Sequence, residues 1–238
     1  MRGREHWDNV QKTLTKKPRR VAVTLKVLKF LKRVIKESKW TEEKKLRIWL
    51  ICCLLFNGSL RVHEALSKTK EDPDPLTTLY KEDLELVKDN IGNDVKSFIR
   101  IHLKSPKENR VGAGVKLEIF ENNTFCCPVK ALTKWQKWVT LRDNEPVFQE
   151  GGVCFTGKDF NKILSSLTSR LTDGTDGVIR PHSFRSGMAT EMGKMGFTDS
   201  EIQQQGRWSS QSFSVYIKMN RLKRLHFTQK IGEMIQKC

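Results

Sequence analysis

Features that mark several common protein classes are missing from this sequence of 238 residues. It has no run of about 18 apolar residues, the length that a transmembrane helix needs. The first residues, MRGREHWDNVQK, have no apolar core, so we expect no secretory signal. Internal repeats and low-complexity tracts are also missing. With 37% hydrophobic residues, the chain is typical of a soluble globular protein with a modest core.

Cysteine is scarce, and its spacing does not favour a metal site. The six cysteines include two adjacent pairs, and none shows the CxxC spacing of a zinc-ligand pair. We therefore expect no metal, and reduced cysteines that are buried as small apolar residues of an intracellular protein. The cysteines are Cys52, Cys53, Cys126, Cys127, Cys154 and Cys238.

Acidic residues are too few to balance the basic ones, and the formal net charge is +17. The excess gathers at the two ends. Residues 1–45 contain fifteen basic residues against five acidic ones, and residues 217–238 contain six against one. Such uneven charge favours a nucleic acid partner over a generally basic surface. The run KKPRR at 16–20 predicts a disordered tail or linker, a linker that lies along DNA, or a nuclear import signal.

The hydrophobic pattern predicts a mainly helical α+β fold with a small three-stranded antiparallel sheet. The run RIWLICCLLF is apolar on all sides and predicts a central buried helix that ends at Asn57-Gly58. Strands are expected over LELVKD, SFIRIHL and VGAGVKLEIF, with the polar turn KSPKENR between the last two. The predicted helices span 24–40, 41–57, 58–68, 128–142, 158–171, 181–196 and a short segment from 198, and 146–157 is expected to be a loop.

These elements divide the chain into three parts. Residues 1–23 form a basic linker or tail, residues 24–217 form one domain, and residues 218–238 form a basic amphipathic helix. That last helix either folds back on the core of its own chain or docks on a neighbouring protomer.

The stretch RPHSFRSGMATEMGKMG begins a helix whose first turn carries two groups suited to phosphate chemistry. Pro181 suits the first turn, and His182 and Arg185 share a face because residues three apart are neighbours on a helix. A histidine in the first turn is disfavoured as a cation, so a neutral imidazole that accepts a proton is expected. Arg185 offers a planar fork to a phosphate. Two polar side chains on a surface helix are the alternative interpretation.

Tyr216 is one of only two tyrosines, the other being Tyr80. As a nucleophile, a tyrosine attacks a phosphodiester and forms a covalent phosphotyrosine, which conserves the bond energy for resealing. This reaction needs cations on the non-bridging oxygens and a proton for the leaving 5′-oxygen, which arginines and a lysine can supply. A tyrosine that packs in the core is the alternative interpretation.

The segments GSLRVHEAL, PHSFR and GRWSSQSFSVY, together with a lysine in the predicted hairpin, resemble the catalytic domain of tyrosine recombinases. These enzymes include the phage integrases and their relatives. The resemblance covers roughly residues 24–220. The phrases RIWLICCLLFNGSLR and GRWSS are most similar to the recombinases of DIRS-like retrotransposons and cryptons, which are eukaryotic mobile elements. The resemblance implies an integrase-like fold.

The resemblance also implies a role for each matching residue. Arg61 and Arg185 would bind the scissile phosphate, and Glu64 would hold active-site side chains in place. Tyr216 would be the nucleophile. His182 would help to activate this tyrosine or would orient the phosphate.

Two positions leave alternatives open. Lys107 matches the hairpin lysine that acts as general acid, because SPK followed by Gly114 is similar to the family pattern, and Lys104 is the alternative. Relatives carry a histidine nine residues before the tyrosine, where this chain has Arg207 followed by Trp208. We prefer Trp208 in that role, with its indole N–H on the phosphate; Arg207 in that role, or ordinary core packing of the tryptophan, is the alternative. Further DNA contacts are expected from Arg207, Lys104, Arg180 and Lys218.

The implied function is site-specific DNA recombination or integration for a mobile element in the nucleus. The enzyme would cleave and rejoin double-stranded DNA through a 3′-phosphotyrosine, without a metal or another cofactor. It would act as a dimer on each site and as a tetramer in synapsis. Residues 1–23 are too short for the N-terminal helical domain that is usual in the family, so we expect a catalytic half. A domesticated DNA-binding module that has lost catalysis and a type IB topoisomerase are the other functions considered.

Overall fold

The computed structural model describes residues 20–91, 93–104, 114–169 and 177–209. Several sequence predictions lie outside these described residues and stay predictions. They concern most of the basic linker, Lys107, Tyr216, Lys218 and the C-terminal helix.

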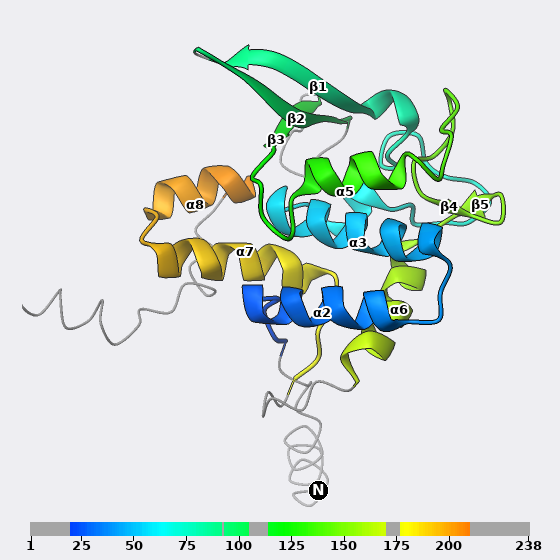
Figure 1. Cartoon of the computed structure of the whole chain (residues 1–238), viewed down its shortest axis with the longest axis horizontal. Helices are drawn as coiled ribbons and strands as arrows, with labels where there is room; N and C mark the ends of the chain where they lie inside the picture. The colour runs from blue at the N-terminus through cyan, green and yellow to red at the C-terminus, as the bar shows by residue number, and fades with distance from the viewer. Residues whose placement is uncertain (1–19, 92, 105–113, 170–176, 210–238) are drawn as a thin grey trace, which may run out of the picture.

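Helix α3 (Glu42–Asn57) is the centre of the fold, as the apolar run predicts (Figure 1). Every residue from Arg47 to Asn57 is buried. The helix packs against α2 (Leu25–Glu37), α5 (Pro128–Trp135) and α7 (His182–Met195). The side chains of Thr24 and Thr41 accept backbone N–H groups at the starts of α2 and α3, so the two N-caps are formed by the residue type that favours them.

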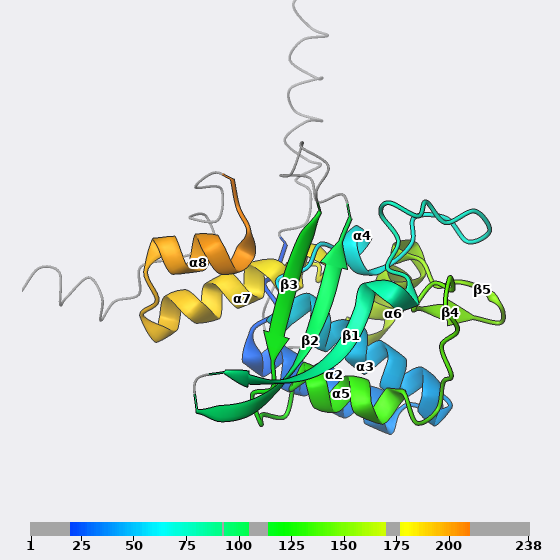
Figure 2. The same cartoon turned by 90° about the horizontal axis from the view of Figure 1, so that it is seen from above.

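The three predicted strands form one antiparallel sheet in the order β1 (Leu84–Ile91), β2 (Asp94–Leu103), β3 (Val115–Phe120). Alternate residues point to the core. Ile99 faces Ile119 across the ladder, and both are buried. This face contacts α5, and Figure 2 shows the sheet lying across α3 and α5. The sheet therefore places the end of β2, with Lys104 directly after it, next to the helical core.

The remaining elements are short and lie around this core. They are α4 (Val62–Ala65), the 3₁₀ turn η1 (Lys81–Asp83), β4 (Gln149–Glu150), β5 (Val153–Cys154), α6 (Gly157–Thr168) and α8 (Asp199–Gly206). A capping box between Thr198 and Glu201 starts α8, as the sequence predicts.

Some predicted boundaries were wrong. The predicted loop 146–157 contains the small antiparallel pair β4–β5. The helix expected over 58–68 is only the single turn α4, because Leu66 is extended and Ser67 forms a bridge with Thr156. Helix α5 ends at Trp135 rather than near residue 142, and the chain then turns so that Val139 and Leu141 pack on the core. Helix α2 ends at Glu37, three residues before the predicted end.

The cysteines within the described residues are buried and unpaired, and burial raises the pKa of the Cys52 thiol well above its usual range. The described residues include no group of three or more His, Cys, Asp or Glu side chains that is arranged to hold a metal ion. Among the helices that the structure describes, none has the length and apolarity to cross a membrane.

The described part of the N-terminal segment is bonded to the start of α7. Val21 N–H donates to the Val178 carbonyl at 3.3 Å, and Val23 N–H donates to the Ser183 carbonyl at 2.8 Å. The two backbones approach closely at Gly187, where a Cβ atom would overlap the Val23 carbonyl. Residues 20–23, which we assigned to a linker, therefore pack on the helix that carries His182.

We predict that Gly187→Ala destabilises the fold by about 1–3 kcal/mol, because the added methyl group overpacks a backbone contact that cannot shift easily. Urea unfolding followed by tryptophan fluorescence measures the change. Ser166→Ala, at an exposed position of α6, is the control and should leave the stability nearly unchanged. Equal stability of Gly187→Ala and the native chain would contradict the packing described.

Candidate active site

The carboxylate of Glu64 is the centre of the candidate site. Its side chain is only 4% exposed. Oε2 accepts the backbone N–H of Arg61 at 2.8 Å, and Oε1 pairs with Arg61 Nη1 at 3.1 Å. Arg207 Nη2 lies 2.9 Å from Oε2. Because Arg61 is the N-cap of α4 and Glu64 is its third residue, a local capping interaction fixes the carboxylate that two arginines share.

A second acceptor, the carbonyl of Ser59, joins the end of α3 to α7 and α8. It accepts Arg185 Nη1 at 2.7 Å and Arg207 Nη2 at 3.3 Å. Ser59 has a positive φ of 46°, a conformation that turns the chain sharply after α3. The carbonyl of Arg207 accepts Arg185 Nη2 at 3.3 Å. The Arg185 side chain is buried, and its guanidinium is thus oriented by two backbone carbonyls.

Trp208 lies on Arg185. The guanidinium carbon is 4.5 Å from the centre of the indole ring, which is a cation–π contact. Gln203 Nε2 donates to the Trp208 carbonyl at 3.0 Å and ties the residue to α8. The ring therefore forms a platform for an arginine of the site.

Arg207 has donors without partners among the described residues. Its backbone is left-handed, with φ of 51°, at the end of α8. Nε and Nη1 are buried, and neither has a hydrogen-bond partner there. Buried guanidinium N–H groups normally have acceptors, so these atoms suit an anion such as a phosphate oxygen. Arg61 and Arg207 pair with the Glu64 carboxylate, and Arg185 joins them through the Arg207 carbonyl, so this cluster carries an excess of positive charge.

His182 starts α7 beside this cluster. Burial lowers the pKa of its imidazole below the usual range, and the charges of Arg185, Arg20 and Arg61 lower it further. The side chain is therefore neutral at pH 7, in agreement with the expectation for a histidine in the first turn. Arg20 comes from the segment that we assigned to a basic linker, and sequence reasoning missed its place next to His182.

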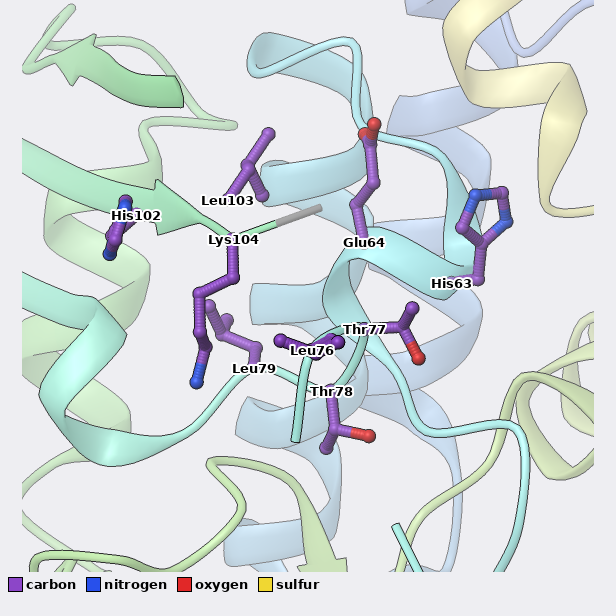
Figure 3. Close-up of a pocket in the computed structure, with 9 residues that line it drawn as sticks. All are labelled: His63, Glu64, Leu76, Thr77, Thr78, Leu79, His102, Leu103 and Lys104. Carbon is purple, nitrogen blue, oxygen red and sulfur yellow. The ribbon is translucent and has the colours of Figure 1, made fainter. Parts of the chain in front are cut away.

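Lys104 lies at the edge of a pocket that Glu64 and His63 also line (Figure 3). Its Nζ is 2.7 Å from Oδ2 of Asp83 and 4.9 Å from the ring centre of Tyr80. Sequence reasoning identified the lysine but missed its carboxylate partner.

The structure thus brings together many of the predicted site residues that it describes. Arg61, Glu64, Arg185, Arg207 and Trp208 form one network, His182 lies beside it, and Lys104 lines an adjoining pocket. Arg180 is exposed just before α7 and is outside the hydrogen-bonded network described above. The roles assigned to these residues stay predictions.

Comparison with solved structures identifies the fold. A structure of the XerH site-specific recombinase bound to palindromic difH substrate, in a post-cleavage complex, matches with a TM-score of 0.60 and 16% identity over 89% of this chain and 52% of its own. The fold is that of a tyrosine recombinase catalytic domain. The predicted α+β fold class is confirmed.

Other tyrosine recombinases and integrases match as well. The XerA recombinase matches with a TM-score of 0.59 and 20% identity over 88% of this chain and 65% of its own. The Tn1549 transposon integrase in complex with a circular intermediate DNA matches with a TM-score of 0.55 and 12% identity over 90% of this chain and 67% of its own. The match therefore covers about half to two thirds of the chains in these solved structures. No protein-family model matches the sequence, and no curated protein matches it significantly.

We predict that His182 makes the folded domain less stable in acid. Its pKa is lowered in the fold, so below the unfolded value of about 6.5 the unfolded chain binds a proton that the folded chain resists. The free energy of unfolding should therefore fall as the pH is lowered from about 7.5 to 5, and His182→Gln should flatten this dependence. Urea unfolding at several pH values measures both curves. Parallel curves for the two proteins would contradict the prediction.

Proposed function

We propose that this chain is the catalytic domain of a site-specific tyrosine recombinase that cleaves and rejoins double-stranded DNA. The observation that carries the proposal is the arginine cluster around Glu64, with the unpaired donors of Arg207 and a neutral His182 beside it. Such an arrangement suits a phosphodiester whose non-bridging oxygens gain charge in the transition state. The recombinase fold agrees with this chemistry.

In the proposed reaction, the phenolic oxygen of Tyr216 attacks the phosphorus, and the bond from phosphorus to the 5′-oxygen breaks. Arg61, Arg185 and Arg207 stabilise the non-bridging oxygens, and His182 accepts the tyrosine proton or orients the phosphate. A lysine ammonium gives its proton to the leaving 5′-oxygen. The product is a 3′-phosphotyrosine and a free 5′-hydroxyl, and the reverse steps reseal the strand. The arginines supply the positive charge, so we expect the reaction to proceed in EDTA.

The wider biological setting is also a proposal. The Tn1549 integrase belongs to a transposon, and the sequence phrases noted above resemble recombinases of eukaryotic mobile elements. We propose integration of a mobile element in the nucleus, by a dimer on each site and a tetramer in synapsis. The excess of basic residues agrees with a DNA partner.

We predict that the protein forms a covalent adduct with a nicked suicide DNA that carries the terminal repeats of its parent element. The adduct should form in EDTA, because no step uses a metal, and should disappear in Tyr216→Phe, which has no nucleophilic oxygen. Gel mobility after denaturation measures it.

Three outcomes separate this function from its alternatives. Salt-sensitive DNA binding without an adduct on any terminal-repeat DNA would contradict the proposal and favour a binding module. Relaxation of any supercoiled plasmid by a monomer would favour a topoisomerase. An adduct that persists in Tyr216→Phe would show that another residue is the nucleophile.

We propose Arg207, rather than Trp208, as the residue that contacts the phosphate. Arg207 Nε and Nη1 are buried without partners among the described residues, whereas the Trp208 ring packs on the Arg185 guanidinium. We predict that Arg207→Gln lowers the single-turnover cleavage rate by about 10²–10³, as loss of one transition-state donor does. Trp208→Phe keeps an aromatic platform and should lower the rate less than tenfold, roughly the worth of one cation–π contact. The reverse order of the two rates would restore Trp208 to the phosphate-binding role.

A further inference from the structure

Asp83 is a buried carboxylate with several donors around it. It ends the turn η1, and its side chain is 4% exposed. Oδ2 accepts the backbone N–H of Tyr80 at 3.0 Å and pairs with Lys104 Nζ at 2.7 Å, while Oδ1 lies 3.9 Å from Nδ1 of His102. A carboxylate that is removed from water needs such partners.

Lys104 is held at two points. Its ammonium pairs with Asp83 and lies over the Tyr80 ring, with the nitrogen 4.9 Å from the ring centre. The lysine side chain is still 24% exposed, so its ammonium can reach solvent or a ligand by rotation. Figure 3 shows Lys104 and Glu64 lining one pocket, with the lysine side chain running away from the Glu64 carboxylate. The position of the ammonium is therefore set by Asp83 rather than by the arginine cluster.

We propose that Asp83 is a positioning residue that binds the Lys104 ammonium in the absence of DNA. A DNA phosphate then replaces Asp83 as the partner of this ammonium. This inference rests on the proposed function, and it assigns the proton donor to Lys104 rather than Lys107. The exchange replaces one anionic partner of the ammonium by another. His102 Nδ1 stays 3.9 Å from the carboxylate after the lysine has left. At the phosphate, the ammonium gives one proton to the 5′-oxygen as that bond to phosphorus breaks, and the amine regains a proton from water.

The test is a double-mutant cycle on single-turnover cleavage at saturating DNA, where the rate constant does not depend on the fraction of folded protein. Asp83→Asn keeps an oxygen for the Tyr80 N–H but removes the charge that competes for the lysine. It should raise the cleavage rate by about threefold to tenfold, the range expected for release of one partly exposed ion pair. Lys104→Ala should lower the rate by about 10²–10⁴, as loss of a general acid does. The acceleration by Asp83→Asn should vanish in the Lys104→Ala background.

A substrate with sulfur in place of the bridging 5′-oxygen isolates the proton transfer, because a thiolate leaves without being protonated. On this substrate Lys104→Ala should cleave at nearly the native rate, and Asp83→Asn should give no acceleration. Lys107→Ala should show the same ratio of the two rates as the native chain. The control for Asp83→Asn is Glu118→Gln, which removes a carboxylate paired with Arg100 on the same sheet and should leave both rates unchanged.

Several results would overturn the inference. One is a cleavage rate in Asp83→Asn that is lower than or equal to the native rate. Another is an Asp83→Asn acceleration that is equally large with and without Lys104. A third is a cleavage rate on ordinary DNA that falls in Lys107→Ala and is restored by the sulfur substrate, while Lys104→Ala shows no such restoration. If the native chain forms no adduct, the proposed reaction is wrong, and DNA-binding measurements then test the exchange of Lys104 between Asp83 and a phosphate. Lys104→Ala should then reduce the slope of log affinity against log salt by about one, and Asp83→Asn should tighten binding only when Lys104 is present. Additive effects on binding would refute the exchange.

Discussion

One buried carboxylate holds the candidate site together. Each guanidinium that leaves water loses solvation, and like charges brought close repel, so burying the three arginines near one another is unfavourable without compensation. Glu64 compensates two of them directly, and the carbonyls of Ser59 and Arg207 accept from the third, Arg185. One carboxylate and two dipoles stabilise the cluster in the folded chain but do not neutralise it. The same arrangement that lets the cluster fold therefore leaves it with the excess positive charge that the proposed reaction uses.

The sequence predicted those parts of the fold and site that depend on local rules. Periodicity and capping residues located α2, α3 and α8, and an apolar run without a polar side marked α3 as the central helix. The His-x-x-Arg spacing placed two site residues at the start of α7. Local rules failed where a distant contact decides the conformation. Leu66 leaves the helix because its neighbour Ser67 pairs with a residue 89 positions later in the chain, Thr156.

The parts of the site that were missed share a physical cause. The left-handed backbone of Ser59, which directs its carbonyl at two arginines, has no signature in residue type, since serine rarely adopts it. From the sequence alone, Asp83 is an acidic residue in a polar turn. Only the register of β2 brings Lys104 next to it. Arg20 reads as one more basic residue of a tail until the Gly187 contact packs its segment on α7. In each case the sequence shows the group, and the tertiary structure supplies its partner.

The candidate site combines groups from two parts of the fold, the helical core and the sheet, so the distance between these two parts bears on the proposed function. The arginine cluster is fixed by the ends of α3, α7 and α8, whereas Lys104 is fixed to the sheet. The helical core and the sheet meet at Gly58, where a Cβ atom would lie 2.7 Å from Cδ1 of Ile119 on β3. Gly58 directly precedes Ser59, so the contact that spaces the sheet from α3 is one residue from the carbonyl that orients Arg185. Close packing transmits small displacements, because neighbouring atoms leave no void to absorb them. A larger residue at this position would displace the end of the Ile119 side chain and crowd the Leu54 carbonyl, so the glycine lets the sheet pack closely on the end of α3.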